Sequence, residues 1–350
     1  MKKVTKDKKK NKSILDYSKS RNTYIVAEIA QSHDGSLGIL YSLINALSKT
    51  GVDAIKFQVH IANAESSLQE PFRTNFSYVD KNRIDYWRRM ELSLDEWAGI
   101  KQKCESLGLE FIATPFSNKA VELLEKLDVC KYKIGSGDFT NKLLIDKILL
   151  TKKELILSIG LVSSEEINEI ISHIKLKNVP FSLLQCTTKY PTNAEDIGLN
   201  KIKFLKDKFK CPVGLSDHSG KIYPGLGAVS LGADIIEAHA TFDKRMFGPD
   251  SKASLTIDEF SELVKGIRFL EKAIQEEVES SDFENLNNIF GKSLAINKNL
   301  DKGEIIRFLD LEGKKPFNQG IPAKDYEKVI GKKLKVSKKM WDFLSEGDIN

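Results

Sequence analysis

The sequence predicts a parallel α/β fold, a (β/α)8 TIM barrel, because short apolar runs alternate with segments of helical pattern. Eight such pairs follow one another over about 250 residues, the usual length of this barrel. The apolar runs are nearly continuous, as expected for strands buried on both faces. Polar residues follow every run, whereas an open doubly wound sheet would gather its functional groups at one switch point. We therefore expect a closed barrel whose functional groups lie on the loops after the strands.

Each expected strand is a short apolar run that ends at a polar or glycine-containing turn. In chain order, the strands are expected at 24–30, 52–59, 109–113, 130–134, 154–158, 181–186, 212–215 and 234–238. The helices are expected at 37–50, 93–107, 118–127, 142–150, 163–174, 199–209, 223–231 and 257–277. Ser93 and Ser163 stand where helices begin, and Gly51 and Gly108 stand where helices end. The polar and aromatic stretch 62–89 is expected to be an active-site loop, because so long a loop in a compact domain is usually functional.

The composition indicates a globular protein with reduced thiols. At 350 residues, with 41% hydrophobic and 29% charged residues, the chain can bury a core for one large domain and a small one. The net charge of +5 comes partly from the Lys-rich start, so nucleic-acid binding is not expected of the body of the protein. Residues 1–22 lack the apolar segment of a secretory signal and are expected to form a poorly ordered tail. No stretch predicts a membrane span, and four scattered Cys suit a cytoplasmic location.

Two of the five histidines stand at equivalent points of consecutive strand–helix units. His218 follows the expected strand 212–215 and His239 follows 234–238, so both imidazoles are expected at carboxyl ends of adjacent strands. Neutral imidazoles so placed could share one divalent metal and leave positions for water and substrate. The spacing fits two hydrogen-bonded histidines at strand ends equally well.

Two lysines, Lys56 and Lys133, are expected on neighbouring strands and point into an apolar barrel mouth. Buried charges need partners, so an anionic ligand is expected unless an acid among the strand ends pairs with these lysines. The turn 135–137, Gly-Ser-Gly, allows close approach of the backbone and offers N–H donors to a phosphate. Such a turn is common by itself, and its place directly after Lys133 is what favours an anion site.

A series of short motifs runs through most of the chain. They are IVAEI (25–29), DGS (34–36), AIKFQ (54–58), KIGSG (133–137), LQCT (184–187), YP (190–191), GLSDH (214–218), GPD (248–250) and KASL (252–255). Through them the chain resembles the sialic acid synthases, the N-acetylneuraminate synthase family, from about Thr23 to Gly347. The resemblance implies a TIM barrel at 23–279, a linker at 280–289 and a small antifreeze-like (SAF) domain at 290–350.

The resemblance implies a synthase that condenses phosphoenolpyruvate with an N-acetylated hexosamine, such as N-acetylmannosamine, and releases inorganic phosphate. It implies His218 and His239 as metal ligands, with Mn²⁺ the usual ion and Mg²⁺ a substitute, and a domain-swapped homodimer. The implied catalytic residues are Glu28 and Asp250. The implied phosphoenolpyruvate contacts are Lys56, Thr114, Lys133, Ser136, Ser158, Thr188 and Ser216, and the implied sugar contacts are Gln58, Asp138, Tyr190, Asp250 and Lys315.

Several positions depart from the common family pattern and leave the sugar open. Asp138 stands where Glu is usual, Thr188 stands where Asn is common, and Lys315 lies where an Arg normally contacts the sugar. A lysine cannot reproduce a bidentate guanidinium contact. Synthesis of legionaminate or pseudaminate from a diacetamido-deoxy sugar is therefore a second interpretation.

Two other classes of protein stay open on the sequence. A barrel aldolase or lyase would use Lys133 as a Schiff-base lysine, but the two histidines and the hydroxyl groups would then have no role. A carbohydrate-binding protein without catalysis would bind the sugar and leave it unchanged.

Overall fold

The structure of the protein is a computed structural model that describes residues 12–74, 76–275 and 281–350. The chain divides into two compact units, Met1–Gln275 and Glu276–Asn350. Each unit has its own hydrophobic core, and each is described by itself.

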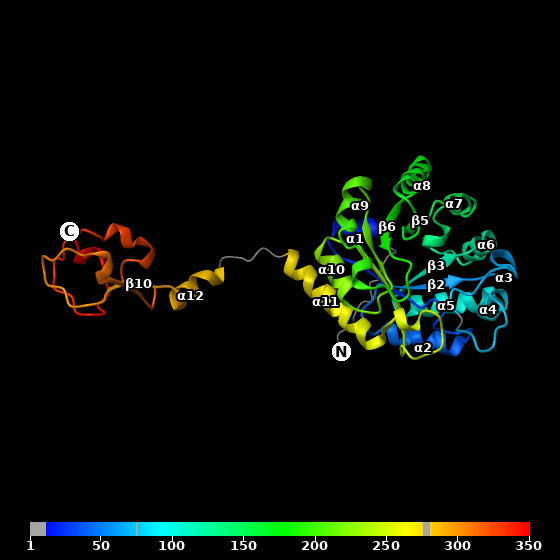
Figure 1. Cartoon of the computed structure of the whole chain (residues 1–350), viewed down its shortest axis with the longest axis horizontal. Helices are drawn as coiled ribbons and strands as arrows, with labels where there is room; N and C mark the ends of the chain where they lie inside the picture. The colour runs from blue at the N-terminus through cyan, green and yellow to red at the C-terminus, as the bar shows by residue number, and fades with distance from the viewer. Residues whose placement is uncertain (1–11, 75, 276–280) are drawn as a thin grey trace, which may run out of the picture. The chain divides into compact units, whose positions relative to one another are not determined.

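The first unit is a closed barrel of eight parallel strands (Figure 1). In order around the barrel they are β1 (Tyr24–Glu28), β2 (Ala54–Val59), β3 (Glu110–Pro115), β4 (Lys131–Ile134), β5 (Glu154–Ser158), β6 (Phe181–Cys186), β7 (Val213–Asp217) and β8 (Ile235–Thr241). β1 pairs with both β2 and β8, which closes the barrel. A two-residue strand, β9 (Leu255–Thr256), lies beside the end of β8. The predicted (β/α)8 fold is confirmed, and the open doubly wound alternative is wrong.

Helices connect the strands and cover the outside of the barrel (Figure 1). They are α2 (Leu37–Leu47), α5 (Leu94–Ser106), α6 (Asn118–Lys126), α7 (Lys142–Leu149), α8 (Ser164–Leu176), α9 (Lys201–Phe209), α10 (Tyr223–Ser230) and α11 (Ile257–Gln275). The side chains of Ser93 and Ser163 cap α5 and α8, each in a reciprocal capping box with a glutamate three residues on. Among the described residues, no helix is long and apolar enough to cross a membrane.

The barrel interior is apolar toward the amino ends of the strands and polar toward their carboxyl ends. The apolar inner layer is made by Tyr24, Val26, Ala54, Ile112, Ile156, Leu184 and Ile235, all nearly or fully buried. A larger core fills the space between the strands and the helices. The polar side chains of the sequence motifs are thereby confined to the carboxyl-end mouth.

Residues 12–22 close the opposite end of the barrel, so the expectation of a poorly ordered tail is wrong for them. Helix α1 (Ile14–Lys19) buries Ile14 completely in the apolar inner layer. The backbone N–H of Ile14 donates to the Glu154 carboxylate at 3.1 Å, and Lys131 Nζ donates to the Lys12 carbonyl at 2.9 Å. A six-residue helix has little stability alone, and its order follows from this docking. Residues 1–11 lie outside the described part of the chain.

The stretch 62–89, expected to be a loop, contains two helices. They are α3 (Ala62–Glu65) and α4 (Arg83–Met90). Ile84, Trp87 and Met90 recur at helical spacing and are buried with Ala62 in a separate apolar cluster. The segment therefore has a small hydrophobic core of its own and forms an ordered structure beside the barrel mouth.

The described part of the second unit starts with helix α12 (Ser281–Phe290), so the stretch 281–289 is helical where a linker was expected, and residue 280 of that linker lies outside the described residues. An antiparallel pair, β10 (Ser293–Ile296) and β11 (Leu311–Lys314), follows. It belongs to a small core that includes Leu294, Ile306 and Leu344. The assignment of this unit to the antifreeze-like class stays a prediction.

Docking of α1 can be tested by truncating its buried side chain. Ile14→Ala should lower the free energy of unfolding of the barrel by about 2–5 kcal/mol, because it opens a cavity in a fully buried layer. Urea denaturation measures the change. The matched control is Leu15→Ala, which removes a neighbouring side chain that is 47% exposed and should change stability little. Equal effects of the two variants would show that α1 is not held by the barrel interior.

Candidate active site

The strand register brings the predicted polar residues to one end of the barrel. Glu28 of β1 stands level with Lys56 of β2 and with His239 of β8. Gln58 of β2 stands level with Thr114 of β3. Because all the strands are parallel, these side chains belong to one rim, where barrel enzymes place their functional groups.

Two lysines and two glutamates form a buried charge cluster at this rim. Lys56 forms a close ion pair with Glu28 and lies 3.4 Å from Glu237, while Lys133 lies 3.6 Å from the same Glu237 oxygen. Ser216 Oγ donates to that oxygen at 2.9 Å. Lys56 and Lys133 are on β2 and β4 with β3 between them, so the expectation of neighbouring strands is wrong. Glu28 and Glu237 pair with these lysines, so an anionic ligand is not needed to neutralise their charges.

The members of this charge cluster differ in how their pKa values shift. Burial lowers the pKa of Lys133, whereas for Lys56 the carboxylates of Glu237 and Glu28 outweigh burial and raise the pKa. Burial also acts on Glu237, but the two lysines lower its pKa to about 2. Burial raises the pKa of Glu28 despite the nearby Lys56. Glu237 is therefore the more acidic of the two carboxyl groups, and Glu28 is the one better able to carry a proton.

Two hydroxyl groups converge on Gly160, two residues after β5. Ser136 Oγ accepts the Gly160 N–H at 3.0 Å, and a Cβ added at Gly160 would lie 2.8 Å from both Ser136 Oγ and Thr188 Oγ1. Within the described residues, the buried hydroxyls of Ser158 and Thr188 have no hydrogen-bond partner. A buried donor without an acceptor lowers the stability of the folded protein, unless a ligand accepts its hydrogen bond. These hydroxyls and Lys133 thus offer an anion several donors.

The two histidines of the metal prediction lie close together, His218 directly after β7 and His239 within the last three residues of β8. Their ring centroids are 5.2 Å apart. His218 Nδ1 donates to the Thr187 carbonyl at 2.8 Å, so Nε2 is the nitrogen that can bind a cation or a proton. The Tyr190 hydroxyl lies 3.1 Å from that Nε2. His239 Nδ1 is buried and has no hydrogen-bond partner in the described residues.

These imidazoles fit a divalent cation. Burial lowers the pKa of His239 to about 3, so its ring is neutral at neutral pH, as a metal ligand must be. Burial acts in the same direction on His218, but hydrogen bonding to Cys186 raises its pKa, so a cation would compete there with a proton. No group of three His, Cys, Asp or Glu that could hold a metal occurs in the ranges the structure describes. Water or substrate would fill the other positions.

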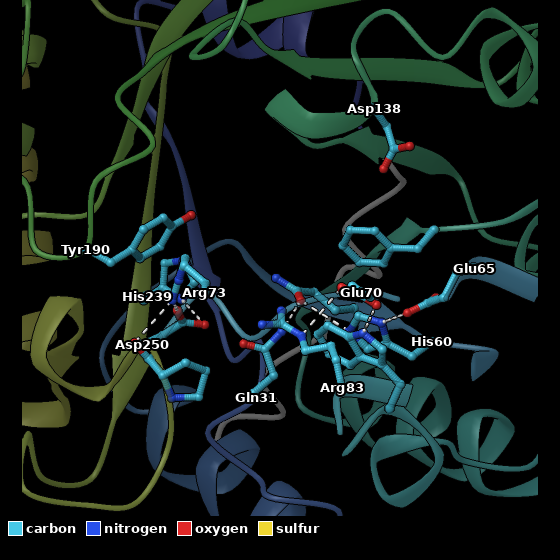
Figure 2. Close-up of a pocket in the computed structure, with 14 residues that line it drawn as sticks. Gln31, His60, Glu65, Glu70, Arg73, Arg83, Asp138, Tyr190, His239 and Asp250 are labelled. Atoms are coloured by element: carbon cyan, nitrogen blue, oxygen red, sulfur yellow. Dashed lines mark hydrogen bonds and ion pairs between the residues drawn. The ribbon is translucent and has the colours of Figure 1, made fainter. Parts of the chain in front are cut away.

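A cavity of about 310 Å³ opens beside the histidines (Figure 2). It brings together the predicted sugar contacts of the barrel: Gln58, Asp138, Tyr190 and Asp250. Arg73 lies 3.9 Å above the centre of the Tyr190 ring and donates to Asp250 at 2.6 Å, so it fixes this end of the cavity. Lys315 belongs to the second unit, where its Nζ lies 5.0 Å from the centre of the Phe290 ring.

Sequence reasoning missed much of this cavity and the acid of the charge cluster. The missed residues are Gln31, His60, Glu65, Glu70, Arg73, Arg83, Trp87, Phe116, Pro249 and the deeper Glu237. Five of them lie in the stretch 62–89, whose length and polarity did point to the site. Glu237 lies two residues before His239 on a buried strand, and a charged residue in such a run was the available signal.

Polar groups gathered at the carboxyl ends of parallel barrel strands define the chain as a (β/α)8-barrel enzyme, because catalytic groups in this fold come from those ends. A sequence profile described as the NeuB family matches residues 43–279. The chain belongs to the NeuB family.

The relatives of the chain cover nearly its whole length. It is 36% identical to the N,N'-diacetyllegionaminic acid synthase of Campylobacter jejuni, over 89% of this chain and 96% of that protein. It is 30% identical to the N-acetylneuraminate-9-phosphate synthase of Homo sapiens, over 92% of this chain and 91% of that protein. A crystal structure of N-acetylneuraminic acid (sialic acid) synthetase from Leptospira borgpetersenii, in complex with citrate, matches with a TM-score of 0.68 and 31% identity, over 76% of this chain and 91% of that one.

The charge cluster predicts that Glu237 is needed to hold two lysines out of water. Glu237→Gln should lower the free energy of unfolding by about 3–5 kcal/mol, because it leaves Lys56 and Lys133 with one carboxylate between them. Inorganic phosphate should raise the melting temperature of this variant more than that of the wild type, since an anion replaces the lost charge. Thermal unfolding with and without phosphate measures both effects. Glu169→Gln, which breaks an exposed pair with Lys142, is the control and should change little.

Proposed function

We propose that the protein condenses phosphoenolpyruvate with the open-chain form of an N-acetylated hexosamine, giving a nonulosonic acid and inorganic phosphate. The observation that carries the proposal is the pairing of an anion-binding cluster, Lys133 with unpartnered hydroxyls, with a sugar-sized cavity beside it. The names of the relatives support it. An N-acetylneuraminate-type product is the first assignment, and legionaminate or pseudaminate is the alternative.

The donor site is assigned to the interior of the mouth. Lys133, Ser136, Ser158, Thr188 and Ser216 bind the phosphate, where charge-assisted hydrogen bonds are strongest. Lys56 and Thr114, whose Nζ and Oγ1 atoms are 3.4 Å apart, bind the carboxylate. Glu237 is the counter-charge to both lysines while the site is empty of substrate.

The reaction forms one carbon–carbon bond and breaks one carbon–oxygen bond. C3 of phosphoenolpyruvate bonds to the aldehyde carbon, whose oxygen takes up a proton and becomes a hydroxyl. Water adds to C2 and loses a proton, and the tetrahedral intermediate expels phosphate by C–O cleavage, which leaves a 2-keto acid. Glu28 is assigned the proton transfer from water, because burial favours its protonated form after the transfer. Asp250, Gln58, Asp138 and Tyr190 orient the sugar.

His218 and His239 are assigned as the ligands of a divalent metal, with Mn²⁺ first and Mg²⁺ as a substitute. A bound metal supplies Lewis-acid polarisation of the aldehyde oxygen. Three observations support this assignment: the ring of His239 is neutral, its Nδ1 has no hydrogen-bond partner among the described residues, and the Nδ1 hydrogen bond of His218 orients its Nε2.

A Schiff-base aldolase is the second candidate, because burial lowers the pKa of Lys133 as a nucleophilic lysine requires. The two candidates differ in covalent chemistry. An aldolase would be trapped on Lys133 by borohydride in the presence of a keto acid, whereas a phosphoenolpyruvate synthase would not.

The function is tested by the products. Purified protein with phosphoenolpyruvate, Mn²⁺ and a panel of N-acetylated hexosamines should release phosphate only when a sugar is present. In water labelled with heavy oxygen, the label should enter C2 of the keto acid and not the phosphate, since C–O cleavage keeps the bridging oxygen on phosphate. Absence of sugar-dependent phosphate release, together with sugar binding, would favour the carbohydrate-binding protein instead.

The metal is tested by its removal. Chelation should abolish turnover and Mn²⁺ should restore it, while His218→Ala should bind Mn²⁺ more weakly in direct titration, because one of two protein ligands is lost. His173→Ala is the control, since this half-exposed histidine of α8 pairs with Asp146 away from the mouth. Full activity of the chelated enzyme would contradict the assignment.

We propose also that the protein is a swapped homodimer in which exposed Lys315 of the second unit contacts the sugar. This assignment rests on the family resemblance. Mixing inactive His218→Ala with an inactive Lys315→Ala variant should restore part of the activity, because hybrid dimers contain one intact site. A monomer that stays fully active without the residues after 279 would refute both parts.

A further inference from the structure

The cavity wall far from His239 is a four-layer stack of planar groups. The Arg83 guanidinium lies 4.6 Å from the centre of the Trp87 ring. Trp87 stacks on His60 at 3.9 Å, and His60 stacks on Phe116 at 4.7 Å. All four residues line the cavity, and Figure 2 shows Arg83 and His60 at the end away from Asp250.

Two glutamates hold the edges of this stack. His60 Nδ1 lies 2.7 Å from Glu65 Oε1, and Trp87 Nε1 donates to Glu70 Oε2 at 3.1 Å. Stacking and edge hydrogen bonds together fix the planes of His60 and Trp87, so Arg83 rests on a rigid surface. A guanidinium held in this way loses little freedom when it binds a ligand.

Arg83 has donors that the protein does not use. Its side chain is 15% exposed and its Nε lies 3.5 Å from Glu70 Oε1, an ion pair without a hydrogen bond. Nowhere in the described residues does one of its nitrogens donate a hydrogen bond, and its Nε is buried without a hydrogen-bond acceptor. Arg73, at the other end of the cavity, donates to Asp250 and to the Pro249 carbonyl. Because buried donors without acceptors are unfavourable, we expect a ligand in this cavity to offer Arg83 a hydrogen-bond acceptor.

The charges that line the cavity indicate whether the acceptor on the ligand is charged or neutral. Its lining holds four carboxylates, Glu65, Glu70, Asp138 and Asp250, but only two guanidinium groups, Arg73 and Arg83. At the Arg83 end, which lies away from the proposed metal ligand His239, Glu65 and Glu70 supply two carboxylates against one guanidinium. A phosphate on the sugar would add two negative charges to this excess.

We propose that Arg83 is a specificity-determining residue, which donates to an uncharged oxygen on the part of the acceptor sugar remote from the reacting aldehyde. This inference rests on the proposed function, which puts the aldehyde at the histidine end of the cavity. The oxygen belongs to a hydroxyl or to the carbonyl of a second acetamido group, and the site disfavours a phosphorylated sugar.

The test compares Arg83→Gln and Arg83→Lys with Arg88→Gln. Arg88 lies on the same helix, is 50% exposed and pairs with Asp85, so its variant should behave as the wild type. Arg83→Gln should raise the Michaelis constant for the acceptor about ten- to hundred-fold, the range for a lost charge-assisted hydrogen bond, and leave that for phosphoenolpyruvate unchanged. Arg83→Lys should recover part of the loss. Equal effects on both Michaelis constants, or none, would overturn the inference.

The sugars in the assay identify the oxygen. N-acetylmannosamine, its 6-deoxy analogue, a diacetamido-deoxy sugar and N-acetylmannosamine 6-phosphate are compared in the wild type and in Arg83→Gln. The sugar that carries the recognised oxygen should lose the most in Arg83→Gln, and the analogue without it should be nearly insensitive to the variant. A wild-type preference for the 6-phosphate would overturn the inference.

Equilibrium binding separates this inference from the proposed function. Wild type that binds the sugars but releases no phosphate would refute the synthase reaction only, and weaker sugar binding by Arg83→Gln would still support the role of Arg83. Turnover in the wild type with equal sugar affinity in Arg83→Gln would refute the role of Arg83 only. A wild type that neither binds nor converts any of these sugars would refute both.

Discussion

The buried cluster of Glu28, Lys56, Lys133 and Glu237 is the interaction on which the mouth of the barrel depends. Each of these side chains is at most 5% exposed, and none could leave water without the others. The four residues come from β1, β2, β4 and β8, so the cluster forms only when these strands stand in one register. A slip of one residue would turn a charge out of the barrel and leave its partners unpaired.

The cluster lies between an apolar layer on one side and further polar groups on the other. Below it, the apolar inner layer is sealed by Ile14 of α1, and this seal excludes water from the amino end. Toward the carboxyl ends of the strands, the buried hydroxyls of Ser158 and Thr188 have no hydrogen-bond partner among the described residues. Desolvation from one side strengthens the electrostatic contacts that a ligand makes from the other.

The segment after β2 adds selectivity without changing the barrel. It contributes its own apolar cluster and the stack of Arg83 on Trp87, and it reaches the mouth from outside the ring of strands. Variation in such a segment costs the barrel little, because its core is separate. The long connections of a barrel can thus alter what binds while the strand ends keep the chemistry.

The sequence by itself determined the barrel and most of its rim, because strand and helix patterns are local and parallel strands carry every carboxyl-end residue to one edge. Glu28, Lys56, Thr114 and His239 could be placed for that reason. The tertiary structure alone decided that Glu237 balances both lysines, that Ile14 plugs the barrel, and that Arg83, Trp87, His60 and Phe116 stack. These contacts join residues far apart in the chain, and the partner of a buried charge or ring is set by distances that exist only once the barrel has closed.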